Sequence, residues 1–499
     1  MMKPVELEIE LFCRGLVISD GLHTEWNARR ITRTRAGLGS GLELVLNPGP
    51  REIWANVPVS EPFARRSSFV LESDGRALFI SDQEHPGDHY PVRLPPEPAW
   101  YSQMTTSGQP MTRVGILQGT YLGIYLGSPC GFWHTRPEPM NCRFCTTGDN
   151  IGRNEARRKS VGDVVEVAHA AREESGVVFT HFNTGFSFEH DASKRRAHGL
   201  EQALPYITAV REQVGGFIGL QAPPLAGECL DEYDHAIDVG ADHFSFCVEF
   251  ETPEIFAALC PGKARYFGQT TFYDAMEYTA RRLGKGRVAG EIIAGCEPIA
   301  ATKRAIDRII ETGAFPTVCI FRPLAGSVLE DWPTPDPLEM REVMAYQYEA
   351  CRRARMPIGV LEDIQVSLVV QPEEARDLVA APDGVDWYEL GLGFARLSTE
   401  QFPERSDQAH LALAIVVAHG LITMVGVFIG YKMLGVAERL ITEGGKRIVG
   451  FATATKPATT GSKEQPKAVV AEVRPRMPSY AAIAPKSDAD ATEVMRILS

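Results

Sequence analysis

From about residue 111 onward, short apolar segments alternate with amphipathic stretches of helical periodicity. Strands that are buried on both faces of a parallel sheet are nearly continuous apolar runs, and each is followed by a crossover helix. Six such units predict an α/β fold, a partial (βα)6 TIM-like barrel rather than a closed barrel of eight units. The expected strands are 114–126, 177–182, 217–222, 243–250, 290–295 and 317–321.

Residues 1–110 show another pattern, and we expect them to form a β-rich N-terminal cap domain. Alternating or apolar segments, such as 6–12, 41–47 and 76–82, are separated by Gly, Pro, Asn and Asp residues typical of turns. The partial barrel is then expected to occupy residues 111–370.

The C-terminal part of the chain does not follow the barrel pattern. We expect a closing segment over 371–408, an apolar helix over 409–435 and a flexible tail over 452–499, where Ala, Pro, Thr, Ser and Lys dominate. Residues 411–431 carry no formally charged side chain and are long enough to span a bilayer. Basic residues on the C-terminal flank would keep the tail on the side of the barrel. An interfacial anchor, a buried subunit contact and a weakly oriented span with the tail outside therefore stay as alternatives.

Composition narrows the class of protein and its compartment. The chain has 499 residues and a formal net charge of -13, which disfavours binding to nucleic acid through phosphates. Ten cysteines are too few for a disulfide-stapled secreted scaffold, and the first residues lack the basic-then-apolar order of a signal peptide. We therefore expect a cytoplasmic protein, associated with a membrane only if residues 411–431 anchor it.

Three cysteines lie in one loop directly after the first expected barrel strand. Cys130, Cys142 and Cys145 have the spacing Cys-x11-Cys-x2-Cys, and active residues on such barrels lie at the carboxyl ends of strands. A structural zinc site needs four protein ligands, and His134 is the candidate for the fourth. Three thiolates on a cubane iron–sulfur cluster would instead leave one iron open to another ligand. The spacing of the cysteines is compatible with both a zinc site and an iron–sulfur cluster.

This loop resembles that of the radical S-adenosylmethionine superfamily, in which three cysteines follow the first strand of a partial barrel and an aromatic residue precedes the last. Phe144 fills the aromatic position, although the gap of eleven residues is wider than the common gap of three. The likeness is closest to biotin-synthase- and lipoyl-synthase-like members, among them archaeal-type two-subunit lipoyl synthases and their bacterial relatives. Residues 95–126 and the CPGK stretch at 260–263 also resemble those members. The second N-terminal cysteine triplet of ordinary lipoyl synthases is absent from this sequence.

The resemblance implies a 4Fe–4S cluster on the three cysteines, with S-adenosylmethionine on the open iron. It also implies that Asn183, Thr184 and Gly185, which follow the second strand, approach the amino group of S-adenosylmethionine. An oxygen-sensitive enzyme is therefore expected.

Charged residues at two other strand ends are candidates for the same pocket. The strand at 243–250 alternates so that Glu249 and Glu251 face the same way as Cys247, and buried carboxylates are costly unless paired or bound to a ligand. The resemblance implies that Glu249 or Glu251 approaches S-adenosylmethionine. Arg322, after the sixth strand, would hold a carboxylate of S-adenosylmethionine or of the substrate.

Cys247, Cys296 and Cys319 lie on or just after the fourth, fifth and sixth strands. The resemblance to biotin synthase makes them candidates for a second iron–sulfur cluster, which would donate sulfur. The alternative is that they are buried thiols that pack as small apolar side chains. The other four cysteines have no spacing partner, and we expect them to be structural.

Together these observations predict a radical S-adenosylmethionine enzyme that abstracts hydrogen from a small or carrier-bound substrate. Sulfur insertion, methylation (a transferase reaction) and rearrangement are alternatives within that class. A different alternative is a non-catalytic iron–sulfur carrier that partners a second radical S-adenosylmethionine subunit. The enzyme would need a cytosolic electron donor such as flavodoxin or ferredoxin. The sequence does not select the substrate.

Overall fold

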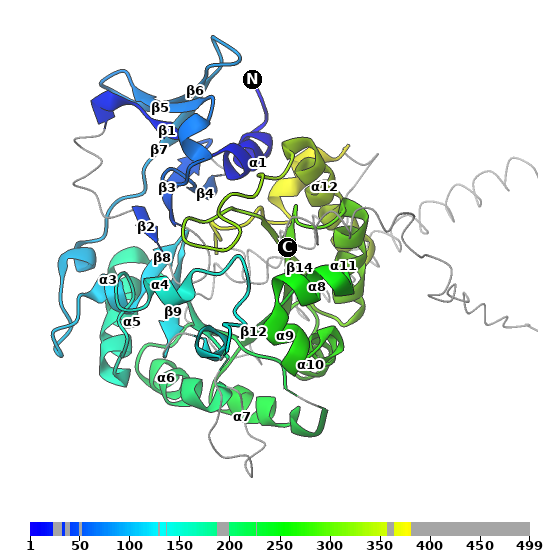
Figure 1. The fold of residues 1–499 in the computed structure, drawn as a ribbon. Coiled ribbons are helices and arrows are strands. Elements are labelled where there is room, and N and C mark those ends of the chain that lie inside the picture. Colours follow the sequence, from blue (N-terminus) through cyan, green and yellow to red (C-terminus); the bar gives the residue numbers. More distant parts are fainter. Residues whose placement is uncertain are drawn as a thin grey trace, which may run out of the picture. The chain divides into compact units, whose positions relative to one another are not determined.

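The computed structural model describes residues 1–22, 32–34, 40–48, 52–127, 130–135, 137–186, 199–225, 227–356 and 364–380 (Figure 1). The chain divides into two units, Met1–Leu411 and Ala412–Ser499, and all described residues belong to the first. The expected apolar helix over 409–435, the tail over 452–499 and most of the closing segment lie outside the described residues. No helix in the described part is long and apolar enough to cross a bilayer.

The barrel sheet has the six predicted parallel strands, and they pair in chain order. An additional strand, β8 (Ile116–Gln118), pairs antiparallel with the first of them. The six strands are buried over most of their length, which explains why they read as apolar runs. They are β9 (Tyr121–Leu126), β10 (Phe179–Thr184), β11 (Phe217–Gln221), β12 (His243–Glu249), β13 (Val288–Ala294) and β14 (Phe315–Ile320).

Helices follow each strand and lie outside the curled sheet (Figure 1). This arrangement confirms the predicted partial α/β barrel. The connection between β12 and β13 is the most elaborate and contains three helices. In chain order the helices are α5 (Val161–Ser175), α6 (Leu200–Gln213), α7 (Glu232–Asp238), α8 (Pro253–Leu259), α9 (Pro261–Tyr266), α10 (Gln269–Leu283), α11 (Ile299–Glu311) and α12 (Pro337–Arg353).

The expected first strand, 114–126, is divided in the structure. Its start belongs to α3 (Met111–Val114), and the rest is the hairpin of β8 and β9. Gly119 makes the turn with φ of 68°, and an added Cβ there would lie 2.0 Å from the carbonyl oxygen of Gln365. Thr120 N donates to the same carbonyl at 3.0 Å. The hairpin therefore fixes the segment 364–373 against the barrel.

The N-terminal region is β-rich, as predicted, but its first element is a helix. Residues 6–12 were expected as a strand because Glu alternates with Leu and Ile, whereas they lie in α1 (Pro4–Arg14). Pro4 occupies the first turn, the Glu6 carboxylate accepts from Lys3 N at 2.8 Å, and α1 packs against β4 and α12. Packing on several sides buries Glu8 as well as the apolar residues, so the alternation did not mark a strand face.

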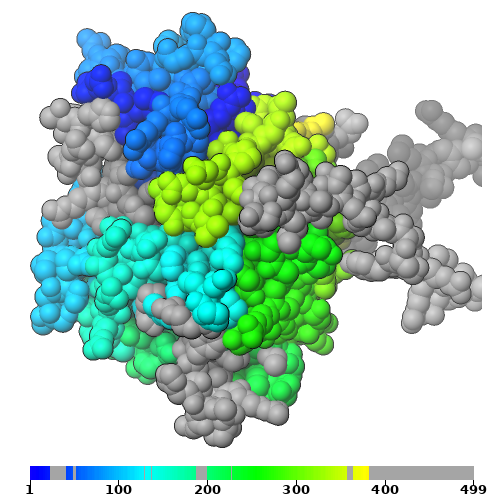
Figure 2. All heavy atoms as spheres, in the orientation of Figure 1, coloured from blue at the N-terminus to red at the C-terminus, as the bar shows by residue number. Residues whose placement is uncertain are grey.

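In the part of the chain that the structure describes, the N-terminal sheet has seven strands, in the order β1-β5-β6-β7-β3-β2, with β4 paired to β3. On the face seen in Figure 2, the yellow-green residues that follow β14 lie against the blue N-terminal residues. The strands are β1 (Val17–Ile18), β2 (Thr32–Thr34), β3 (Ser40–Leu46), β4 (Ile53–Val57), β5 (Phe69–Ser73), β6 (Leu78–Asp82) and β7 (His89–Arg93).

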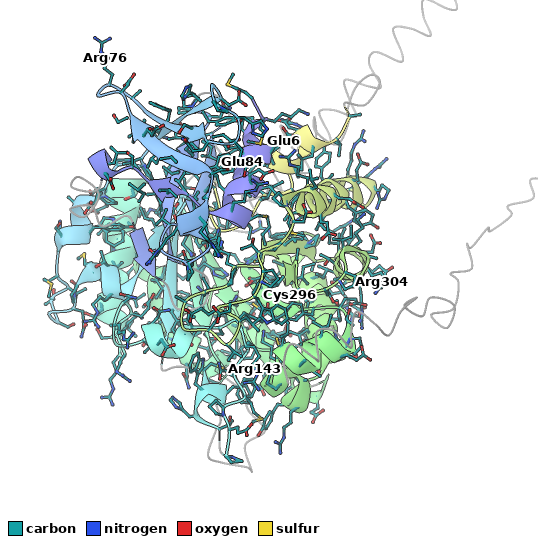
Figure 3. All side chains as sticks on the ribbon, turned by 45° about the horizontal axis from the view of Figure 1, so that its top comes forward. Glu6, Arg76, Glu84, Arg143, Cys296 and Arg304 are labelled. Carbon is teal, nitrogen blue, oxygen red and sulfur yellow. The ribbon has the colours of Figure 1, made fainter. Side chains whose placement is uncertain are left out.

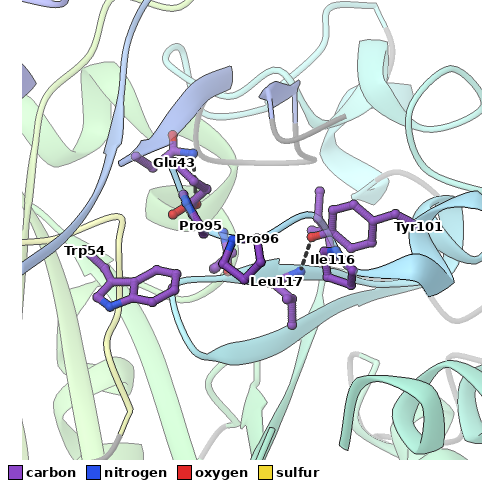
Figure 4. Close-up of a pocket in the computed structure, with 11 residues that line it drawn as sticks. Glu43, Trp54, Pro95, Pro96, Tyr101, Ile116 and Leu117 are labelled. Carbon is purple, nitrogen blue, oxygen red and sulfur yellow. Dashed lines mark hydrogen bonds between the residues drawn. The ribbon is translucent and has the colours of Figure 1, made fainter. Parts of the chain in front are cut away.

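A small cavity of about 40 Å³ lies where this sheet meets the β8–β9 hairpin (Figure 4). Glu43 and Trp54 line it from the sheet, and the Tyr101 hydroxyl accepts a hydrogen bond from Leu117 N at 3.2 Å. Such a volume holds only a few water-sized molecules. We therefore interpret this cavity as a packing gap between the two sheets rather than as a substrate site.

Asp163 stabilises the start of α5 and connects it to the preceding turn. Its carboxylate accepts from Ser160 N at 2.9 Å in a capping box, and also from Thr105 Oγ1 at 2.6 Å and Ser107 Oγ at 2.5 Å. Burial alone would raise the pKa of Asp163, but these hydrogen bonds outweigh burial and lower it from 3.8 to about 2.

We expect Asp163→Asn to lower the free energy of unfolding by about 2 kcal/mol at neutral pH. Because the folded-state pKa lies below the unfolded value, this stability is present above about pH 4 and is lost as the pH falls towards about 2. Urea unfolding at neutral and acid pH measures the difference. Asp274→Asn, at an exposed position of α10, is the control and should change stability by less than about 0.5 kcal/mol. A difference that persists undiminished in acid would contradict the assignment.

Candidate active site

The three loop cysteines line one cavity of about 230 Å³ at the carboxyl ends of the barrel strands. Cys130 follows β9 and precedes the short helix η3 (Gly131–His134), while Cys142 and Cys145 come just before α4 (Thr147–Asn150). All three are partly exposed and none is in a disulfide. Residues at the ends of the strands complete the lining, among them Tyr125, Asn183, Gln221, Glu249, Ile293 and Cys319. The predicted convergence of the loop and the strand ends is present.

Backbone hydrogen bonds fix this cysteine loop to three other segments. Gly131 N donates to Phe186 O at 2.6 Å, Arg143 N to Leu259 O at 2.8 Å, and Val328 N to Arg143 O at 2.9 Å. The Phe132 and Phe186 rings stack with their centroids 4.5 Å apart. The thiols are therefore held in place by the protein itself, as a preorganised ligand site requires.

The CPGK stretch packs directly beneath the loop. Gly262 N donates to Met140 O at 3.0 Å, and a Cβ on Gly262 would lie 2.5 Å from the Phe132 ring. Cys260 is fully buried, and a hydrogen bond between the two thiols makes it the main cause of the lowered pKa of Cys142. We expected Cys260 to have only a structural role, so its contact with a loop cysteine is new information from the fold.

The three thiols fit a cluster better than a single ion. Within the described ranges, no three His, Cys, Asp or Glu side chains come close enough to share one metal ion. Two thiolates on one zinc would lie within about 4.6 Å of each other, twice the Zn–S bond length. Thiolates on different irons of a cubane do not have to meet that limit. His134, the candidate fourth zinc ligand, is exposed and does not line the cavity.

Burial raises the pKa of Cys130 to about 12 and also raises the pKa of Cys145. The Cys145 thiol donates to Thr147 Oγ1 at 3.1 Å. Binding to a metal would require all three thiols to lose their protons, and a cationic cluster supplies that driving force.

Glu249 lines the cavity next to Lys263, the last residue of the CPGK stretch, to which the sequence analysis assigned no role. Lys263 Nζ lies 2.5 Å from Glu249 Oε1 and donates to Cys247 O at 2.8 Å. Glu249 has a positive φ of 70° beside a bulge in the pairing of β12 with β13. For a residue other than glycine, this backbone conformation costs about 1–3 kcal/mol and is concentrated at functional sites. Burial alone would lower the pKa of Lys263, but the Glu249 carboxylate, and after it Cys142, hold it well above its usual value.

The remaining residues predicted for S-adenosylmethionine fall into two groups. Phe144, Asn183, Thr184 and Gly185 all line the cavity. The Thr184 hydroxyl donates to Gln221 O at 3.0 Å, which ties the ends of β10 and β11 together.

Glu251 and Arg322 lie outside the residues that line this cavity. The Glu251 carboxylate accepts from the Tyr273 hydroxyl at 2.9 Å and lies 3.6 Å from Arg308. Arg322 packs over the Phe12 ring at 4.7 Å and donates to Asn56 Oδ1 at 3.4 Å, so it connects the barrel to the N-terminal sheet.

The three candidate ligands of a second cluster do not all line this cavity. Cys247 and Cys319 line the cavity. Cys296, labelled in Figure 3, is buried after β13 and is not among the lining residues. The Cys247 thiol donates to Glu291 Oε2 at 3.0 Å and accepts from Gln221 Nε2 at 2.8 Å. Burial raises its pKa well above the usual value. These three cysteines therefore fit buried neutral thiols better than a shared cluster.

Sequence reasoning missed Gln221 and Glu291, which meet Cys247 inside the barrel. Each is the one polar side chain in an otherwise apolar expected strand, 217–222 or 290–295, and that contrast was the available signal.

Comparisons with known proteins show limited similarity. No family model matches the chain. The chain is 26% identical over 253 residues to bacteriochlorophyllide c C-7(1)-hydroxylase of Chlorobaculum limnaeum, a match that covers 48% of this chain and 61% of the relative's length.

Solved structures with a similar arrangement include methylornithine synthase and a radical SAM methyltransferase from Sphaerobacter thermophilus. The first is 16% identical with a TM-score of 0.35 and covers 47% of this chain and 64% of the other. The second is 12% identical with a TM-score of 0.34 and covers 57% and 75%. Likenesses this low carry no argument about function, which rests below on the residues of this chain.

Proposed function

We propose that this protein is a radical S-adenosylmethionine enzyme. The observation that carries the proposal is that Cys130, Cys142 and Cys145, spaced Cys-x11-Cys-x2-Cys after the first strand of a six-strand partial barrel, line one cavity at the strand ends. When bound there, a 4Fe–4S cluster and S-adenosylmethionine supply the one-electron chemistry that removes a hydrogen atom from a C–H bond. The finer assignment to the biotin-synthase- and lipoyl-synthase-like group stays a prediction.

Other residues of the chain would bind and orient the cofactors. Asn183, Thr184 and Gly185 present polar atoms and backbone at the cavity wall next to Cys130. Glu249 is a candidate for contact with S-adenosylmethionine, and Lys263 would balance its charge in the buried setting. Phe144 and the stacked Phe132 and Phe186 rings keep water from the reacting carbon.

The test is anaerobic reconstitution of the full chain, followed by iron and sulfide analysis and incubation with S-adenosylmethionine and dithionite. We expect about four irons per chain and release of 5′-deoxyadenosine. A chain that binds the cluster but releases no 5′-deoxyadenosine, with dithionite or with flavodoxin as donor, would favour the alternative of a non-catalytic iron–sulfur carrier that partners another subunit.

Oxidation at a carbon atom is the reaction that the relative supports. The 26% identical protein is a hydroxylase, and the proposal extends its reaction type, not its substrate, to this chain. Sulfur insertion, methylation and rearrangement stay predictions within the same class. Sulfur insertion has the least support, because the cysteines expected to hold a second cluster do not line one cavity.

Gly185 is expected to be required for full cluster loading, because it leaves room for the first cysteine. A Cβ at this position would lie 2.7 Å from Cys130 Cα and 2.6 Å from the Tyr125 hydroxyl. Gly185→Ala must therefore displace the backbone that carries the Cys130 thiol, and we expect iron content to fall to less than about half.

The matched control is Gly162→Ala in the first turn of α5, where the nearest atom to an added Cβ is Ser160 Oγ at 3.7 Å. This control should keep its full iron content and gain up to about 1 kcal/mol from helix propensity. Equal iron in both variants would show that the close approach at Gly185 does not matter.

A further inference from the structure

A second cavity of about 160 Å³ lies at the amino ends of the barrel strands. Phe179, Ala289 and Phe315, at or near the starts of their strands, line it from the barrel. The segment 364–373, fixed in place by the Gly119 turn, lines it from the other side with Ile364, Val369 and Val370. We call this space the lower chamber, and the cavity at the loop cysteines the upper chamber.

The two chambers adjoin inside the barrel. Tyr121, His181 and Glu291 line both of them. A molecule in the lower chamber would therefore have one end at the layer of His181 and Glu291, facing the space where the cofactors are proposed to bind. The small cavity between the N-terminal sheet and the β8–β9 hairpin shares no such wall with the upper chamber, apart from Gln118.

Polar groups in the lower chamber select the chemistry of a ligand. His243 and Gln347 are more than nine-tenths buried, and neither His243 Nδ1 nor Gln347 Oε1 has a hydrogen-bond partner among the described residues. A buried amide oxygen without a partner is costly, and a ligand donor would satisfy it. Glu291 and Glu373 add carboxylates to an otherwise mostly apolar wall.

The charges around the lower chamber disfavour an anionic ligand. Burial, together with the neighbouring His181 and Arg287, lowers the pKa of His243 well below its usual value, so this ring is neutral at physiological pH. No cationic side chain lines the chamber among the described residues, whereas two carboxylates do. A ligand anion would have to be desolvated without a partner.

We propose that the lower chamber binds the substrate, and that the substrate is an uncharged, largely apolar small molecule that carries a hydrogen-bond donor. Its role as substrate rests on the proposed function, whereas the binding itself can be measured without a loaded cluster.

The probe is indole, which is uncharged and aromatic and has one N–H donor. Calorimetric titration of the full chain should show saturable binding of one indole. We expect 1-methylindole, which lacks the donor, and indole-3-acetate, which is an anion, each to bind at least about tenfold more weakly. Absence of indole binding, or equal affinity for the anion, would overturn the proposal.

Substitutions that fill one chamber or the other test where the probe binds. Ala289→Leu and Thr317→Leu fill the lower chamber from two different strands, and each should weaken indole binding by at least about tenfold. Ala222→Leu makes the same change in the upper chamber and should leave indole binding unchanged. Wild-type affinity in both filling variants would overturn the proposal.

Iron analysis of the same variants separates this proposal from the proposed function. A chain that binds indole as expected but takes up no cluster contradicts the enzyme assignment and leaves the lower chamber as a binding site. A chain that loads the cluster but does not bind indole contradicts the lower chamber alone.

Discussion

Replacing Cys142 with alanine is expected to abolish the cluster and, with it, cleavage of S-adenosylmethionine. Cys142 lines the upper chamber with Cys130 and Cys145, and its thiol is the one whose pKa a neighbouring cysteine lowers. Even residues in the outer shell of a metal site change affinity or activity by about 10- to 100-fold, so loss of a direct ligand should cost more than about 100-fold. Iron content should fall from about four to less than about one per chain.

The control for Cys142→Ala is Cys229→Ala. Cys229 lies on η4 (Gly227–Cys229), is half-buried and does not line either chamber. This variant should load iron and release 5′-deoxyadenosine like the wild type. Cys130→Ala and Cys145→Ala should behave as Cys142→Ala does. Full iron content in any of the three would show that the loop does not hold the cluster through that thiol.

Lys263→Met is expected to have the largest effect on stability. The substitution keeps the length of the side chain but leaves the Glu249 carboxylate buried without the ammonium that lies 2.5 Å from it. Removing one partner of a buried ion pair costs about 3–5 kcal/mol, because the remaining charge has no compensation. Denaturant unfolding of the apoprotein measures this loss, and cluster loading should fall with it.

Two further variants test this explanation. The double variant Lys263→Met/Glu249→Gln removes the uncompensated charge and should recover most of the lost stability. Lys303→Met breaks the pair with Glu342, a carboxylate that is 57% exposed, and should cost less than about 1 kcal/mol. A similar cost for Lys263→Met and Lys303→Met would mean that Lys263 and Glu249 are effectively solvated.

The barrel could be predicted from the sequence because strands that are buried on both faces consist mostly of apolar residues. The six strands are apolar runs, and Cys130, Cys142 and Cys145 follow the first of them within one loop. The same kind of pattern led to a wrong prediction for the helix α1. Its Leu7, Ile9 and Leu11 alternate with glutamates, which is the pattern of a strand. Periodicity reports which residues are buried, and it misleads where a helix is packed on several sides.

Contacts between distant segments explain the rest of what the sequence did not predict. The CPGK stretch that contains Lys263 was noted in the sequence, but only the fold shows that its lysine pairs with Glu249. Arg322 was expected in the cofactor pocket because it follows a barrel strand, but its partners Asn56 and Phe12 come from the N-terminal region. A position after a strand predicts the edge of the sheet at which a residue lies. It does not predict the direction of the side chain.

The position of α1 has a consequence for the order in which the chain folds. This helix precedes the whole barrel in the chain, yet Arg341 of α12 binds both Glu6 and Glu10, at 3.3 and 2.9 Å. The pair of Arg341 and Glu10 spans 331 residues of chain. At about 5–20 residues per second, a ribosome needs roughly 20–70 s to reach the arginine. During that time α1 can pack against β4 but lacks its contacts with α12, and we expect a slow final docking of α12 and binding of the nascent chain by chaperones.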